Sequence, residues 1–283
     1  MINVESIKAK LKIISQERGI ELQNLFNKLG EERFLARLAV SSWANNLIFK
    51  GGSLLPHLVE TSRRTRDIDF SIRDLDNTLN NLINIIQEVT AIDLKDGFVF
   101  RKPIGEVLKH SRLPYTGARI KIDFLLEKIG GSIWMDLALG DTVDPVKQKI
   151  EVLRYKGKPI VGRDISLLAY PPEFLFAEKF QTAILLGAAN SRMKDFYDML
   201  KLANSRSINM TSLKSALERT FKNRTTPLAN CLEFSSEDVN VLDITWKGFL
   251  RKWDLDDVPE DFGVVVSNLN EFLGKIKIDK KQD

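Results

Sequence analysis

The sequence predicts an α+β fold: a small mixed sheet, preceded in the chain by helices and followed by a helical bundle. Apolar residues recur at three- and four-residue spacings over the first 45 residues, which indicates helices. Short runs in the middle of the chain alternate polar with apolar residues, as half-buried strands do. From Pro171 onward the helical spacing returns, and it predicts helices at about 173–187, 191–203, 212–222, 236–252 and 260–275.

The middle of the chain supplies the expected strands. Leu47, Ile48 and Phe49 form a short apolar run that ends in Gly51-Gly52-Ser53, which predicts a strand followed by a tight turn. A short helix should follow at 54–58, with Pro56 in its first turn. The pattern then predicts a strand from Asp67 to Ile72, a helix at 75–89, and further strands at 97–101, 118–126 and 132–139.

Composition restricts the chemistry. The chain has 283 residues, 43% of them hydrophobic and 28% charged, which is ordinary for a globular enzyme. A single cysteine, Cys231, excludes an internal disulfide or a multi-cysteine zinc site, and two histidines exclude a histidine-rich metal site. A metal would therefore be held by oxygen ligands, which favours Mg²⁺ or Mn²⁺. No apolar run reaches the roughly 18 residues that span a membrane, and the charged N-terminus is unlike a signal peptide, so we expect a cytoplasmic protein without a membrane partner.

Two aspartates, Asp67 and Asp69, carry the strongest chemical signal. One residue apart on a strand, they place both carboxylates on one face, where two such charges repel each other unless a cation lies between them. The preceding Gly51-Gly52-Ser53 turn could bring backbone N–H groups and a hydroxyl close to a phosphate. Each feature is common by itself; in this order they predict metal-dependent phosphoryl or nucleotidyl transfer.

These residues lie in a stretch that resembles the signature of the nucleotidyltransferase (DNA polymerase β-like) superfamily, namely FKGGSLLPHLVETSRRTRDIDFSI. More narrowly, the chain resembles the AbiEii/AbiGii toxins of bacterial toxin–antitoxin and abortive-infection systems. Two later segments extend the likeness over about residues 30–203: IWMDLALGDTVDP and PPEFLFAEKFQTAILLGAANSRMKDFYDML. The resemblance implies a nucleotidyltransferase-fold sheet, with an NTP as co-substrate.

The resemblance also assigns roles by position. Gly52 and Ser53 would hold the incoming triphosphate, while Asp67 and Asp69 would ligate the metal. The third carboxylate, which ligates metal and helps activate the acceptor hydroxyl, is expected to be Asp136, because Gly140-Asp141 after it fits the family pattern; Asp123, on another predicted strand, is the rival.

A second group of expected site residues belongs to the predicted helices at 173–187 and 191–203. Lys179 would contact the triphosphate, and Asp195 would orient Lys179 or the base. Arg192 and Asp198 are further expected nucleotide-binding residues, at spacings that let them form one cluster with Asp195. The structural alternative is a solvated charged helix face or a Lys–Asp pair without a catalytic role.

The expected organisation is N-terminal helices packed on the core (1–45), a catalytic core (46–165) and a C-terminal helical domain that completes the active-site cleft (166–283). The resemblance implies a toxin that transfers a nucleoside monophosphate to RNA, with the 3′ end of tRNA as the acceptor, and an antitoxin encoded nearby. Arg63, Arg64 and Arg66 could contact nucleic-acid phosphates. The alternatives are a small-molecule nucleotidyltransferase of the aminoglycoside type and an inactive NTP-binding scaffold.

Overall fold

The computed structural model describes residues 3–276 except 64, 66, 110–115 and 140–142. The chain forms two compact units. The first contains Met1–Ser53, Arg66–Gly140 and Pro145–Ala169, and the second contains Leu54–Thr65, Asp141–Asp144 and Tyr170–Asp283. The chain therefore leaves the first unit directly after the Gly-Gly-Ser turn and returns to it just before the Asp67–Asp69 strand.

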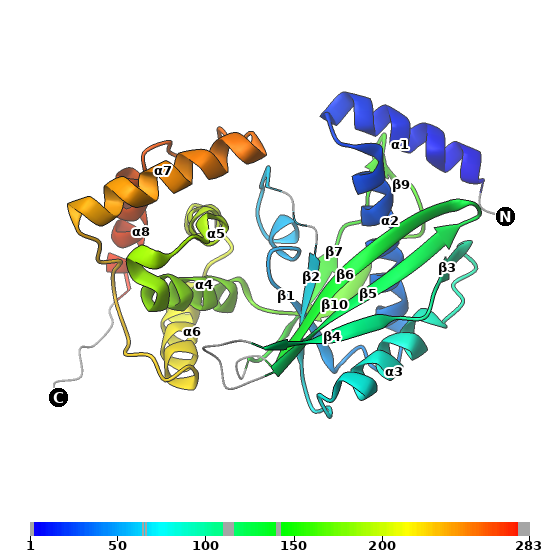
Figure 1. Cartoon of the computed structure of the whole chain (residues 1–283), viewed down its shortest axis with the longest axis horizontal. Coiled ribbons are helices and arrows are strands. Elements are labelled where there is room, and N and C mark those ends of the chain that lie inside the picture. Colours follow the sequence, from blue (N-terminus) through cyan, green and yellow to red (C-terminus); the bar gives the residue numbers. More distant parts are fainter. Residues whose placement is uncertain (1–2, 64, 66, 110–115, 140–142, 277–283) are drawn as a thin grey trace. The chain divides into compact units, whose positions relative to one another are not determined.

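The first unit is built on a mixed sheet with the strand order β3-β5-β6-β2-β1-β10-β7 (Figure 1). Strand β4 also pairs with β5, beyond the end of β3. The pairs β2–β6 and β1–β10 are parallel, and the others are antiparallel. In chain order the strands are β1 (Leu47–Lys50), β2 (Asp67–Ile72), β3 (Phe98–Phe100), β4 (Ile104–Lys109), β5 (Thr116–Leu126), β6 (Ile129–Leu139), β7 (Val146–Ile150) and β10 (Ile165–Ala169).

Helices α2 (Leu22–Val40) and α3 (Leu79–Thr90) pack on one face of this sheet, and α1 (Val4–Arg18) packs on α2. The ring of Phe34 on α2 lies 6.3 Å from that of Phe70 on β2, so the even-numbered side chains of β2 point into the core. A buried ion pair fixes α2 further, because Arg37 donates to both carboxylate oxygens of Asp96, each at 2.8 Å. By alternation, the odd-numbered residues of β2 project from the opposite face.

The predicted α+β class is confirmed, and the main differences are strands that the sequence did not reveal. Strands β4, β7 and β10 were not predicted, nor was the small hairpin of β8 (Arg154–Tyr155) and β9 (Lys158–Pro159). Strand β7 reads Val-Lys-Gln-Lys-Ile and is mostly exposed, so its sequence carries little apolar alternation. Such a strand is specified by its hydrogen-bonded neighbour β10 and not by its own pattern.

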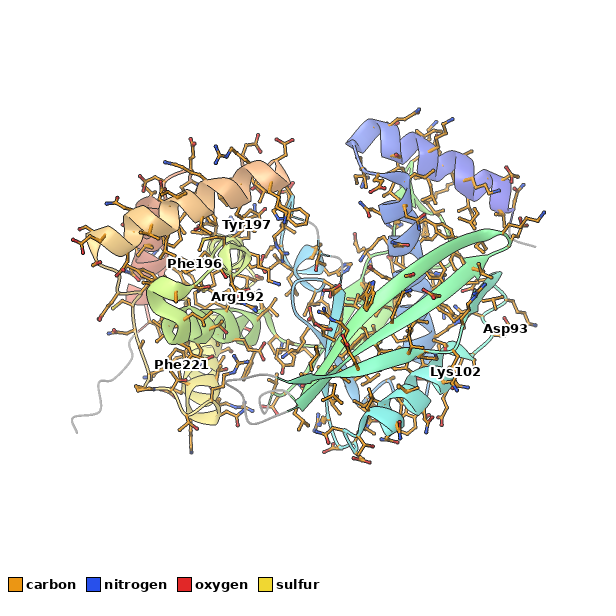
Figure 2. The ribbon with its side chains drawn as sticks, in the orientation of Figure 1. Asp93, Lys102, Arg192, Phe196, Tyr197 and Phe221 are labelled. Atoms are coloured by element: carbon orange, nitrogen blue, oxygen red, sulfur yellow. The ribbon has the colours of Figure 1, made fainter. Side chains whose placement is uncertain are left out.

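The second unit is helical (Figure 1). Its helices are η1 (Leu55–His57), α4 (Pro172–Leu186), η2 (Gly187–Ala189), α5 (Met193–Ala203), α6 (Met210–Asn223), α7 (Ser236–Trp253) and α8 (Phe262–Gly274). Aromatic side chains such as Phe196 of α5 and Phe221 of α6 fill its core (Figure 2). The ring of Phe196 meets that of Phe262 edge-on at 5.0 Å, and the ring of Phe221 lies 5.6 Å from that of Phe180. Among the described residues, no helix has both the length and the apolar character that a membrane crossing requires.

Candidate active site

Three aspartates lie side by side on the sheet face opposite to α2 and α3. Asp67 and Asp69 project from β2, and Asp69 is the register partner of Asp136 on the parallel neighbour β6. The side chain of Asp67 is 40% exposed and that of Asp136 is 25% exposed, so both are open to solvent. Because adjacent strands lie about 4.8 Å apart, the register brings carboxylates from distant parts of the chain onto one patch.

The Gly-Gly-Ser turn follows β1, which is the other neighbour of β2. Gly51 has φ +74°, in the left-handed region, and a Cβ atom built on it would lie 2.0 Å from Oδ2 of Asp69. Only glycine leaves that space for the carboxylate. Gly52 follows half-buried, and Ser53 is buried, with its Oγ 3.5 Å from the Lys50 carbonyl. The turn and the aspartate strand therefore fit together at the atomic level.

A guanidinium lies against two of these three aspartates. Arg119 of β5 lies opposite Asp136 and donates to both its oxygens, from Nε at 2.8 Å and from Nη2 at 2.7 Å. The same Nη2 lies 3.5 Å from Oδ2 of Asp67. The hydrogen bonds to Asp136 raise the pKa of Arg119 above its ordinary range. Within the described part of the chain, no three acidic, histidine or cysteine side chains are grouped so that they could hold a metal ion as they stand.

Asp123, the rival for the third carboxylate, lies farther along the sheet. It is the register partner of Ser132, four positions before Asp136 on β6, or roughly 13 Å away along the strand. Its carboxylate accepts from the Ser132 hydroxyl at 2.6 Å and pairs with Lys121 at 3.0 Å. These bonds lower the pKa of Asp123, the Ser132 hydroxyl contributing most.

The expected helical residues form one buried ion network in the second unit. Nζ of Lys179 on α4 lies 2.9 Å from Asp195 and 2.7 Å from Asp198, two aspartates of α5 that are almost inaccessible to solvent. Arg192, labelled in Figure 2, pairs with Asp195. Its side chain is 49% exposed. Burial alone would lower the pKa of Lys179, but the charges of Asp195 and Asp198 outweigh burial and raise it.

Arg63 completes this network and does not behave as expected. Its guanidinium donates to both oxygens of Asp198, at 2.8 and 2.9 Å, and its side chain is only 6% exposed. The expectation that Arg63 contacts nucleic-acid phosphates is therefore wrong for this structure, because a buried and doubly bonded guanidinium cannot reach a ligand. Arg64, Arg66 and the Gly140-Asp141 turn lie outside the described residues.

The segment around Arg63 is held on α5 by a second contact. The hydroxyl of Tyr197 accepts from the Thr61 hydroxyl and the Ser62 N–H, each at 3.2 Å, and donates to Asp257 at 2.8 Å. Together with Arg63, these bonds fasten the segment that joins the glycine turn to the aspartate strand.

Two features of this arrangement were not identified from the sequence: the contact of Arg119 with the aspartates and the specific role of Gly51. In the sequence Arg119 is one of several basic residues between positions 95 and 121, and nothing local to it reveals which residue of β6 it faces. The Gly-Gly pair predicts a glycine with positive φ, but it does not predict that the Asp69 carboxylate occupies the space of a side chain at Gly51.

A mixed sheet that gathers carboxylates beside a glycine turn is the arrangement expected of a nucleotidyltransferase. The chain belongs to the family described as nucleotidyl transferase AbiEii toxin of type IV toxin–antitoxin systems, whose model matches residues 33–268. This match confirms the resemblance stated from the motifs. No curated protein sequence matches the chain.

Among solved structures, the chain is similar to the crystal structure of JHP933 from Helicobacter pylori, with 14% identity over 89% of this chain and 94% of that one. The TM-score of 0.46 makes this a distant likeness, from which nothing about activity follows.

Proposed function

We propose that this nucleotidyltransferase moves a nucleoside monophosphate from an NTP to an RNA acceptor, the 3′ end of tRNA, in a reaction that depends on Mg²⁺ or Mn²⁺. The observation that supports this most is the common face of Asp67, Asp69 and Asp136 beside the Gly51-Gly52-Ser53 turn. The acceptor is an inference from the family resemblance, and the family's toxin–antitoxin system implies a cognate antitoxin as partner.

The donor set fits a hard divalent cation, because carboxylate oxygens on one open face are the ligands that Mg²⁺ and Mn²⁺ prefer. Asp67, Asp69 and Asp136 would hold it, and when bound it neutralises triphosphate charge during transfer. In the step itself, the acceptor oxygen bonds to the α-phosphorus, the bond from that phosphorus to the pyrophosphate oxygen breaks, and pyrophosphate leaves. Asp136 takes the hydroxyl proton.

The turn would bind the triphosphate through its backbone. Gly52 and Ser53 supply N–H groups at the end of β1, the strand next to the aspartates. The Ser53 hydroxyl would add a further donor to the phosphate.

In the helical unit, we infer that Lys179 contacts the triphosphate. Its side chain is 11% exposed, and its ammonium group is held by Asp195 and Asp198 at 2.9 and 2.7 Å. Asp195 and Asp198 are nearly or fully buried, so we assign them positioning of Lys179 and not direct nucleotide contact. Arg192, whose side chain is 49% exposed, would bind phosphate or base.

Transfer to labelled product tests the proposal. Purified protein is incubated with Mg²⁺, each α-labelled NTP in turn and total tRNA, beside an EDTA control and the variant Asp69→Asn. Label on tRNA that requires both Mg²⁺ and Asp69 supports the proposal. Label on an aminoglycoside-type acceptor but not on tRNA, or NTP binding without transfer, would support one of the two alternatives instead.

The role of Lys179 is tested separately with a matched variant. Arg224 is another poorly exposed cation of the same unit and pairs with Glu178 of α4 at 3.0 Å. Lys179→Ala should abolish transfer, whereas Arg224→Ala should lower only the stability. Equal transfer by the two variants, per mole of folded protein, would remove Lys179 from the site.

A further inference from the structure

Arg119 links three strands through one charged group. It belongs to β5, whereas its partners Asp136 and Asp67 belong to β6 and β2. The guanidinium thus lies where the charges of two proposed metal ligands meet. A divalent cation that bound both carboxylates would need part of the same space.

Structural support alone does not account for this contact. The side chain of Arg119 is 35% exposed, and ion pairs at that exposure contribute little to the stability of a fold. Neighbouring carboxylates, in contrast, repel each other strongly unless a positive charge compensates them. The main effect of Arg119 is therefore that its positive charge compensates the negative charges of Asp136 and Asp67.

We propose that Arg119 is an internal counter-cation that competes with the divalent metal for Asp136 and Asp67 and so sets the metal affinity of the site. This inference rests on the proposed metal site. Both oxygens of Asp136 accept hydrogen bonds from Arg119, so a cation can ligate Asp136 fully only after the guanidinium has turned away. The charge of Arg119 also repels the incoming cation until the two exchange.

The same strand offers a matched control. Lys121 lies two positions after Arg119 and on the same face, but it pairs with Asp123 at 3.0 Å and lies 5.8 Å from the ring centre of Trp134. Lys121→Gln removes the same unit of charge from the same strand without opening the Asp136–Asp67 pair. Arg119→Lys keeps the charge but loses the two-pronged geometry.

The test is direct Mn²⁺ binding without nucleotide, measured through the electron paramagnetic resonance signal of free Mn²⁺. Breaking the two-pronged ion pair and overcoming the repulsion by the charge of Arg119 should together cost the wild type about tenfold in affinity, so Arg119→Gln should bind Mn²⁺ about tenfold more tightly. Lys121→Gln should change the affinity by less than about twofold because its ammonium group pairs with Asp123 and not with Asp136 or Asp67. Arg119→Lys should fall between the wild type and Arg119→Gln.

Asp67→Asn reports whether the bound Mn²⁺ occupies this site. If Asp67→Asn lowers the affinity but Arg119→Gln leaves it equal to or below that of the wild type, Arg119 supports the ligands and the competition is overturned, while the metal site stands. If Asp67→Asn binds Mn²⁺ as well as the wild type, the metal is bound elsewhere, and both the proposed site and the role of Arg119 fail. The rise in melting temperature with Mn²⁺ is a second readout, and it should be largest for Arg119→Gln.

Discussion

Gly51→Ala tests whether the glycine turn and the aspartate strand act as one unit. The new methyl group would lie 2.0 Å from Oδ2 and 2.5 Å from Cγ of Asp69, both far inside contact distance. The carboxylate must therefore move, or the turn must shift. Alanine at φ +74° adds a backbone cost of about 1–2 kcal/mol of its own.

Gly157 separates these two effects. It has φ +75° in the β8–β9 turn, and a Cβ atom there would meet nothing within 4 Å. Gly157→Ala should therefore lose about 1–2 kcal/mol of stability from backbone strain alone and keep full activity per folded molecule. Gly51→Ala should lose at least as much stability and, because a displacement of about 1 Å in a reactive group can cost about 100-fold, most of its transfer activity.

The assays are urea denaturation for stability and incorporation of α-labelled nucleotide for activity, each normalised to folded protein. Equal activity of Gly51→Ala and Gly157→Ala would refute the reasoning, since it would mean that the space beside Asp69 is irrelevant to transfer.

Three other predictions concern the framework of the two units. Burial raises the pKa of Glu32 from 4.5 to about 7, so its contribution to stability is complete below pH 4.5 and is lost as the pH rises through 7. Relative to Glu32→Gln, the wild type should therefore lose about 3 kcal/mol of unfolding free energy between pH 4.5 and 8 in urea denaturation. Parallel pH profiles of the two proteins would contradict this. Asp96→Asn leaves the buried charge of Arg37 uncompensated and should lower the free energy of unfolding by about 3 kcal/mol, whereas a loss below about 1 kcal/mol would show that the pair is hydrated. Tyr197→Phe removes the acceptor of the Ser62 N–H, so that amide should exchange with deuterium faster than in the wild type, and unchanged protection would mean that Arg63 alone holds the segment.

Local patterns in the sequence determined most of the elements. The strand of Asp67 and Asp69 was predictable because alternation places both carboxylates on one face whatever the strand pairs with. The helices after Pro171 were predictable because their apolar spacing is long and regular, and they begin and end within a few residues of the predicted positions. The motifs, in their order along the chain, were sufficient for the family.

Only the tertiary structure decided which distant residues meet. That Asp136 lies beside Asp69, and that Arg119 faces Asp136, depends on the register of β6 against β2 and β5, and a shift of one residue would turn each side chain to the other face. Arg63 looked like a surface residue of a basic cluster, yet the fold buries it against Asp198. Periodicity reports which face a residue occupies, but register and burial arise from long-range pairing, which a single sequence does not encode locally.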